Sequence, residues 1–282
     1  MTKDANFYKT AFQNSTFIIK ISGKILSNLE YLENVIENIK FLQDCNIKVI
    51  IVCGFGKQLD ELSKKLFNKD SQKINGRRVT NYEDIEAAKM CCGKIICDIN
   101  GLFSKHNITF TSIFPITKKI IDVQKRQIDT SQNFGLVGDV MSVHSNEILN
   151  ILEENMLLCI ASLAVNCKTS EILNINADTI TSSLAASLKA EKVIFISDVD
   201  FVKDKNNQKI SVIKYNEISN LINSGVIKDG MLVKLENIKK IIENGTQKVH
   251  IINGMVKNAI KEEMFSQNGI GTVIECDKSY NY

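Results

Sequence analysis

Residues 48–56 read Lys-Val-Ile-Ile-Val-Cys-Gly-Phe-Gly, a short apolar run that ends in two glycines. The β-branched residues favour a buried strand, and the leucines at 59, 62 and 66 favour a helix directly after it. A glycine-bearing loop between a strand and a helix can hold an anion on its backbone N–H groups. This stretch therefore predicts a strand, an anion-binding loop and a helix in succession.

The same alternation continues outward from this unit in both directions. Strands that alternate with helices from end to end predict an α/β fold, an open αβα sandwich around a mainly parallel sheet. No linker or low-complexity stretch divides the chain, although 108–139 shows only short extended pieces. The apolar patterns predict strands at 17–21, 156–165, 192–197 and 248–252 and helices at 29–45, 82–105, 178–189, 215–223 and 231–243.

Composition narrows the class of protein. Of the 282 residues, 44% are hydrophobic and 24% are charged, which is ordinary for a globular chain. The net charge of +3 is too small to favour nucleic acid or an anionic membrane as a partner. The first residues lack the apolar core of a signal peptide and no run of 18 apolar residues occurs, so we expect a cytoplasmic protein. The eight cysteines are scattered and the three histidines lie far apart, which favours reduced thiols and no metal site.

Lysine and glycine residues follow the first two predicted strands. Lys20 and Gly23 stand at the end of the strand at 17–21, and Gly54, Phe55 and Gly56 follow the next strand. In open α/β sheets ligands bind at the carboxyl ends of the strands, so the two loops together could hold a phosphoryl group. Neither loop fits the P-loop pattern, and the sequence contains no protein-kinase motif set.

Seven segments extend this pattern over almost the whole chain. Their ordered set resembles the acetylglutamate kinases of the amino-acid kinase family, and the resemblance implies the amino-acid kinase fold. The segments are F-I-I-K-I-S-G (17–23), N-G-R-R-V-T (75–80), G-L-V-G-D-V (135–140), N-I-N-A-D (174–178), L-K-A-E-K-V-I-F-I-S-D-V (188–199), D-G-M-L-V-K (229–234) and G-I-G-T (269–272).

The resemblance implies roles for individual residues. Lys20 and Lys234 match the two family lysines that flank the transferred phosphoryl group, and Asp178 matches the carboxylate that holds those lysines in position. Phosphoryl transfer needs such cations and little covalent help. Arg78 and Asn174 match residues that bind the acceptor, where a guanidinium suits a carboxylate. The remaining implied positions are Gly54 and Phe55 at the acceptor and Gly23, Gly56, Ser197, Asp198, Gly230 and Met231 at the nucleotide.

Each of these residues also has an ordinary alternative. The two lysines could be solvated surface residues, and the glycines after the second strand could simply form turns. Arg78 could be a basic turn residue after Asn75-Gly76. Asp178 could be a helix cap and Asn174 a turn former.

The implied reaction transfers a phosphoryl group from ATP, bound as its magnesium complex, to the side-chain carboxylate of N-acetyl-L-glutamate, a step of arginine biosynthesis. No protein cage for the magnesium is expected. Ser22, Cys53 and Phe55 interrupt the family's glycine loops, which usually read Gly-Gly and His-Gly-Gly-Gly, and 109–127 lacks the usual glycine- and aspartate-bearing stretch. These departures leave two alternatives open. One is a kinase for another carboxylate, such as an aminoadipate derivative, and the other is a non-catalytic ligand-binding paralogue that regulates a partner.

The resemblance also implies two lobes and an oligomer. We expect an N-terminal lobe at 1–170 for the acceptor and for dimerisation, and a C-terminal lobe at 171–282 for ATP. The expected partners are small-molecule substrates and a second copy of the chain in a homodimer. An apolar stripe in the N-terminal segment would either join dimers into a hexamer, as in arginine-inhibited members, or pack on its own lobe. The stripe consists of Phe7, Tyr8, Ala11 and Phe12, and the run at 263–272 resembles the arginine site of those members.

Overall fold

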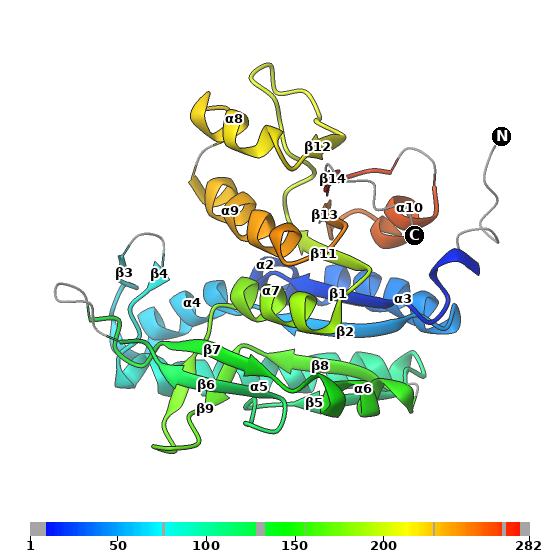
Figure 1. Cartoon of the computed structure of the whole chain (residues 1–282). Coiled ribbons are helices and arrows are strands. Elements are labelled where there is room, and N and C mark those ends of the chain that lie inside the picture. Colours follow the sequence, from blue (N-terminus) through cyan, green and yellow to red (C-terminus); the bar gives the residue numbers. More distant parts are fainter. Residues whose placement is uncertain are drawn as a thin grey trace.

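The computed structural model describes residues 10–74, 77–127, 133–154, 156–227, 229–266 and 269–276, without the side chains of Arg77, Asp229 and Val233. Its centre is an eight-stranded sheet, which Figure 1 shows with β12 at the top and β5 at the bottom. In spatial order the strands are β12 (Val212–Lys214), β14 (Thr272–Glu275), β13 (Lys248–Asn253), β11 (Lys192–Ser197), β1 (Thr16–Ile21), β2 (Lys48–Cys53), β8 (Leu157–Ala161) and β5 (Phe110–Ile113).

Neighbouring strands of this sheet are parallel, except that β13 and β14 are antiparallel. The first strand, β1, lies in the middle, where Ile19 stands opposite Ile51 of β2 and Ile194 of β11. A parallel sheet has both faces covered, and its strands read as continuous apolar runs. The prediction of an open αβα sandwich around a mainly parallel sheet is confirmed.

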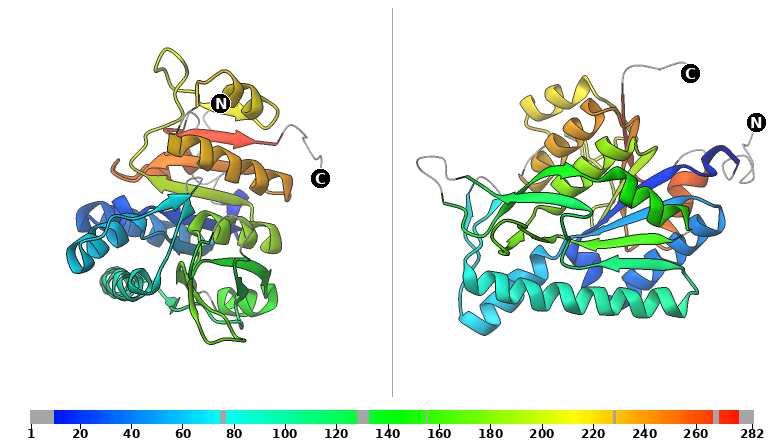
Figure 2. Two further views of the ribbon diagram at one scale, coloured as in Figure 1. Left: turned by 90° about the vertical axis from the view of Figure 1, so that its left-hand side faces the viewer. Right: turned by 60° about the horizontal axis from the view of Figure 1, so that its bottom comes forward.

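Helices cover both faces of the sheet (Figure 2). The division follows from the two hydrophobic clusters to which their buried residues belong. One face carries α2 (Gly23–Leu26), α3 (Leu29–Asp44), α4 (Gly56–Phe67), α5 (Tyr82–Lys105) and α10 (Ala259–Phe265), and the other carries α6 (Ser145–Glu153), α7 (Ala177–Leu188), α8 (Glu217–Asn223) and α9 (Asp229–Glu243). None of the helices in the described part of the chain is both long and apolar enough to cross a membrane.

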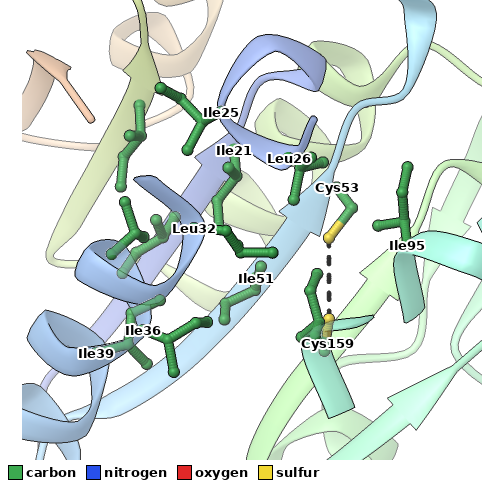
Figure 3. Close-up of a cluster of buried hydrophobic side chains, with 14 of the residues drawn as sticks. Ile21, Ile25, Leu26, Leu32, Ile36, Ile39, Ile51, Cys53, Ile95 and Cys159 are labelled. Carbon is green, nitrogen blue, oxygen red and sulfur yellow. Dashed lines mark hydrogen bonds between the residues drawn. The ribbon is translucent and has the colours of Figure 1, made fainter. Parts of the chain in front are cut away.

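The residues of β1 alternate between the two faces. Phe17, Ile19 and Ile21 belong to the cluster under α3 and α5, part of which is drawn in Figure 3, whereas Ile18 belongs to the cluster under α7 and α9. Side chains of a strand alternate with a period of two. Lys20 therefore points to the same face as Ile18, toward α7.

Three two-stranded sheets complete the fold, and they account for the stretches where the sequence pattern was weakest. The region 108–139 contains β5, all of β6 and the start of β7. The single strand predicted at 156–165 is divided at Ser162, because β9 leaves the main sheet and pairs with β10. The pairs are β3 (Lys73–Ile74) with β4 (Arg77–Arg78), β6 (Ile121–Lys125) with β7 (Gly138–Val143), and β9 (Leu163–Val165) with β10 (Ile172–Asn174).

The described end of the N-terminal segment packs on its own chain. The ring of Phe12 meets those of Phe17 and Phe265 edge-on, with centroids 5.4 and 6.0 Å apart. Phe7 and Tyr8 of the predicted apolar stripe lie outside the described residues. For Phe12, these contacts favour packing on its own lobe, and the hexamer stays a prediction.

The strands of the main sheet separate by their place in the chain. Residues before 170 supply β1, β2, β5 and β8, and residues after 171 supply β11 to β14. The two groups meet where β1 pairs with β11, and the sheet runs through this line without interruption. The lobes expected from the sequence therefore share one sheet.

Candidate active site

A cavity of about 480 Å³ lies where the loops after β1 and β2 meet the first turn of α7. It is the edge at which ligands bind in open α/β sheets. Six basic and three acidic side chains line it, so the wall has an excess of positive charge. The structure brings together nine of the predicted site residues here: Lys20, Gly23, Gly54, Phe55, Gly56, Arg78, Asn174, Asp178 and Asp198.

An ion pair between Lys20 and Asp178 lies in the cavity wall, with Nζ 2.9 Å from Oδ1. Both side chains are about 15% exposed, so neither is a solvated surface group. Asp178 is not the cap of α7, because the side chain of Asn176 accepts the backbone N–H of Thr179. The capping alternative for Asp178 is therefore wrong.

Lys234 approaches the same carboxylate from α9, which packs against α7. Burial raises the pKa of Asp178, but the charges of Lys20 and Lys234 outweigh this effect and hold the pKa below its usual value. Burial and the charge of Lys20 lower the pKa of Lys234 to about 8, against the opposite influence of Asp178 and Asp198. The carboxylate of Asp178 thus pairs with Lys20 and also interacts electrostatically with Lys234.

Gly54 lets the lysine of β1 and the first turn of α7 come this close. A Cβ at this position would lie 3.3 Å from Cε of Lys20 and 3.4 Å from Cβ of Ala177. Its backbone N–H donates to the carbonyl oxygen of Ile21, at 3.0 Å, and joins the two loops. Gly54 therefore allows close packing around the ion pair and does not only form a turn.

Phe55 borders the cavity but is only 3% exposed and belongs to the hydrophobic cluster under α3 and α5. Its backbone starts α4, since the N–H of Leu59 donates to the Phe55 carbonyl oxygen. We expected a loop residue whose ring stands in the substrate site. The structure places the residue in the apolar core instead, because an aromatic ring gains free energy from burial there.

Arg78 of β4 lines the same cavity and is held by two contacts. One guanidinium nitrogen donates to the Gly56 carbonyl oxygen at 2.9 Å, and the other lies 2.5 Å from Oδ1 of Asp60 on α4. Its side chain is 11% exposed, so the alternative of a solvated turn residue is wrong. Asn174 lines the same cavity from β10 and donates to Oγ1 of Thr80, at 3.1 Å.

The other predicted nucleotide residues lie outside the cavity wall. Ser197 is the buried last residue of β11, and its Oγ accepts the N–H of Val199 at 3.4 Å. Gly230 and Met231 form the first turn of α9, where Met231 packs against the core under that helix. Their contact with a nucleotide stays a prediction.

Five further charged side chains line the cavity that sequence reasoning missed, and three of them had a visible signal. Lys24 directly follows Gly23 and Lys57 directly follows Gly56, and Asp60 lies one helical turn after Gly56. The other two come from segments whose placement the sequence does not reveal: Lys73 and Arg126.

The atypical Cys53 faces away from the cavity. It is fully buried, and its Sγ lies 3.9 Å from that of Cys159 on β8 (Figure 3). Hydrogen bonding to Cys159 and burial raise the pKa of the Cys53 thiol well above its usual value. A neutral thiol in the apolar core has no direct part in the chemistry of the cavity.

The arrangement suits transfer of an anionic group. Lys20 and Lys234 present two positive charges near Asp178, and preorganised charges of this kind stabilise a phosphoryl group in transfer. Arg78 in the same wall carries a guanidinium fork of the kind that suits a carboxylate, and here it is paired with Asp60. A cavity with an excess of basic side chains can hold a phosphorylated donor beside a carboxylate acceptor.

Comparisons with known proteins agree with this geometry. The model of the amino acid kinase family matches residues 15–253. The acetylglutamate kinase of Campylobacter fetus subsp. fetus is 34% identical and that of Campylobacter hominis is 32% identical, each over 269 residues that cover 95% of this chain and 94% and 93% of those proteins.

The fold also matches a solved structure, N-acetylglutamate synthase from Neisseria gonorrhoeae complexed with coenzyme A and N-acetyl-glutamate. The TM-score is 0.90 at 18% identity, and the match covers 98% of this chain. The chain spans 63% of the length of that synthase, so this likeness supports the fold alone. The family match over residues 15–253, with relatives above 30% identity along almost the whole chain, shows that the chain belongs to the amino acid kinase family.

Proposed function

We propose that this chain transfers the γ-phosphoryl group of ATP to the side-chain carboxylate of N-acetyl-L-glutamate, giving ADP and N-acetylglutamyl 5-phosphate, a step of arginine biosynthesis. The observation that carries the proposal is the Lys20–Asp178 ion pair, on which the charge of Lys234 also acts, in the wall of a cavity that Arg78 lines as well. The relatives named acetylglutamate kinase support the same acceptor.

In this reaction a carboxylate oxygen of the acceptor attacks the γ-phosphorus, the bond from that phosphorus to the β,γ-bridging oxygen breaks, and ADP leaves. Lys20 and Lys234 stabilise the charge on the transferring group, and Asp178 keeps the two ammonium groups in place. No general base is needed, because a glutamate-type side chain has a pKa of about 4.3 and is already ionised at neutral pH.

ATP enters as its magnesium complex in this proposal. The two aspartates beside the lysines do not form a ready metal cage, because Asp178 pairs with Lys20 and Asp198 pairs with Lys24. Magnesium is commonly held by substrate phosphates with few protein ligands. The ion would come with the nucleotide and neutralise part of its charge.

The two halves of the sheet divide the work between the substrates. We assign the acceptor to residues 1–170, which contain Arg78, and ATP to residues 171–282, which contain Asp198 and Lys234. We also propose a cytoplasmic homodimer. Exposed apolar side chains on α5, Tyr82 and Met90, at 73% and 56% exposure, are consistent with an interface on that helix.

An ADP-release assay across a panel of carboxylate acceptors tests the proposal. We expect N-acetyl-L-glutamate to give the highest kcat/KM, above N-acetyl-aminoadipate, glutamate and aspartate. A higher value for the aminoadipate derivative would assign another acceptor. Binding of ATP without turnover of any acceptor would favour a regulatory protein.

A further inference from the structure

Lys24 is a basic residue of the cavity to which no role has been given so far. It follows Gly23 in the short helix α2, directly after β1, and lines the wall together with Lys20 and Asp198. Its Nζ lies 2.5 Å from Oδ2 of Asp198, the residue directly after β11. This ion pair therefore joins the ends of two neighbouring strands, one from each half of the chain.

The pair continues a series of alternating charges. Lys20 pairs with Asp178, Lys234 acts on the pKa of both Asp178 and Asp198, and Asp198 pairs with Lys24. Three lysines and two aspartates leave an excess of positive charge along this side of the cavity. An approaching polyphosphate supplies several negative charges and competes with Asp198 for the ammonium of Lys24.

The backbone around Lys24 is held by hydrogen bonds, while the side chain of Lys24 is largely exposed. The N–H of Ser22 donates to the Ile196 carbonyl oxygen at 2.9 Å, and Nε2 of Gln58 donates to the Gly23 carbonyl oxygen at 2.6 Å. The side chain of Lys24 itself is 55% exposed. An exposed ion pair adds little to folding stability, so replacing Lys24 leaves the fold intact.

A second polar group in the same loop supports a ligand at this place. Ser22 lines the cavity, and its Oγ is shielded from solvent without a hydrogen-bond partner among the described residues. A buried hydroxyl left unpaired is costly, and a bound phosphate oxygen would pair it. Ser22 and Lys24 thus flank Gly23 with two donors.

Building on the kinase function above, we propose that Lys24 binds the phosphates of the nucleoside triphosphate, beside the hydroxyl of Ser22, and that Asp198 holds this ammonium before the nucleotide arrives. Lys24 then contributes to nucleotide affinity. Lys20 and Lys234 differ from it, because they stand at the carboxylate of Asp178 and act on the transferring group.

Calorimetric titration of the full chain with MgADP tests this assignment. Lys24→Met should weaken MgADP binding by about tenfold, which is the effect of losing one charge-assisted hydrogen bond. The KM for ATP should rise in proportion, and kcat should stay within about twofold of the wild-type value. Lys24→Arg should restore both values to within about threefold. Ser22→Ala should weaken binding by about threefold.

The matched control is Lys105→Met, which removes another exposed ion pair outside the cavity. Lys105 lies 2.5 Å from Glu33, with exposures of 62% and 31% that resemble the 55% and 30% of the Lys24–Asp198 pair. It should leave MgADP binding unchanged. MgADP affinity equal to wild type in Lys24→Met, or an equal loss in Lys24→Arg, would overturn the assignment.

The titration needs no acceptor. If the wild type fails to phosphorylate acetylglutamate, the proposed acceptor is wrong, and the MgADP comparison still decides the role of Lys24.

Discussion

Lys20 and Lys234 share one carboxylate, and this geometry predicts how their loss affects the enzyme. Replacing either by alanine should lower kcat about 10²- to 10³-fold, because the missing charge stabilises the transferring group most strongly in the transition state. Binding of MgADP should change by no more than about threefold. Steady-state kinetics and calorimetry measure the two quantities, and near-normal turnover in either variant would remove these lysines from the mechanism.

The same pair predicts a pH dependence. Lys234 has a pKa of about 8, so its ammonium is present below that pH and is lost as the pH rises through it. The value of kcat/KM for MgATP should therefore fall above about pH 8. Lys234→Arg keeps its charge, because a guanidinium does not titrate in this range, and should move the decline to higher pH even if its overall rate is lower. An identical alkaline limb in both proteins would assign the titration to another group.

Phe55 carries a prediction about stability, since its ring belongs to the core beside the cavity. Phe55→Ala should lower the free energy of unfolding by about 3–5 kcal/mol, as large-to-small changes in a core do. Urea unfolding followed by circular dichroism measures the change. Leu29→Ala, at a side chain that is 60% exposed, is the control and should change stability by less than about 0.5 kcal/mol.

The contrast between Lys20 and Phe55 shows what the sequence could and could not predict about the site. Alternation along a strand fixes the face on which Lys20 stands, and the ordered motifs imply its partner. The direction of a side chain at a strand-to-helix junction, such as Phe55, depends on whether the neighbouring helices leave space for it in the core. The contact of Arg78 with Asp60 could not be predicted from the sequence either. It joins a short hairpin to a helix, and only tertiary packing brings the two together.

At the scale of elements, the long periodic segments were predicted well and the short ones were not. The helix at 82–105 was predicted with the bounds of α5, whose start is fixed by the capping box of Asn81 and Asp84. The strand at 156–165 was wrong at its end, since nothing local marks the point where β9 leaves the sheet. Pairing of two- and three-residue strands is decided by distant partners and leaves no periodic pattern.

The N-terminal segment also gives a prediction at this scale. Phe12 packs between Phe17 and Phe265, and Nζ of Lys192 lies 5.5 Å from its ring centroid. Phe12→Ala should therefore lower Tm and leave the molar mass in light scattering unchanged. A fall in mass without loss of Tm would show that the segment joins subunits instead.

At the scale of the whole molecule, the shared sheet predicts that the two halves depend on each other. β1 pairs with β11 on one side and with β2 on the other. Fragment 1–170 alone would therefore lack the partner strand β11, and fragment 171–282 alone would lack the partner strand β1. Each fragment should show weak far-ultraviolet circular dichroism and no cooperative unfolding transition. Their co-expression should restore part of the signal. A fragment that unfolds cooperatively by itself would contradict this dependence.

The position of β1 has a further consequence for biosynthesis. The strand leaves the ribosome first, yet one of its two neighbours, β11, spans Lys192–Ser197 and is made much later. At about 5–20 residues per second, the β11 side of β1 stays unpaired for on the order of ten seconds or more. An apolar strand with a bare edge pairs readily with other chains. A strand that lies in the middle of the finished sheet is thus a prime target for chaperones while the chain is being made.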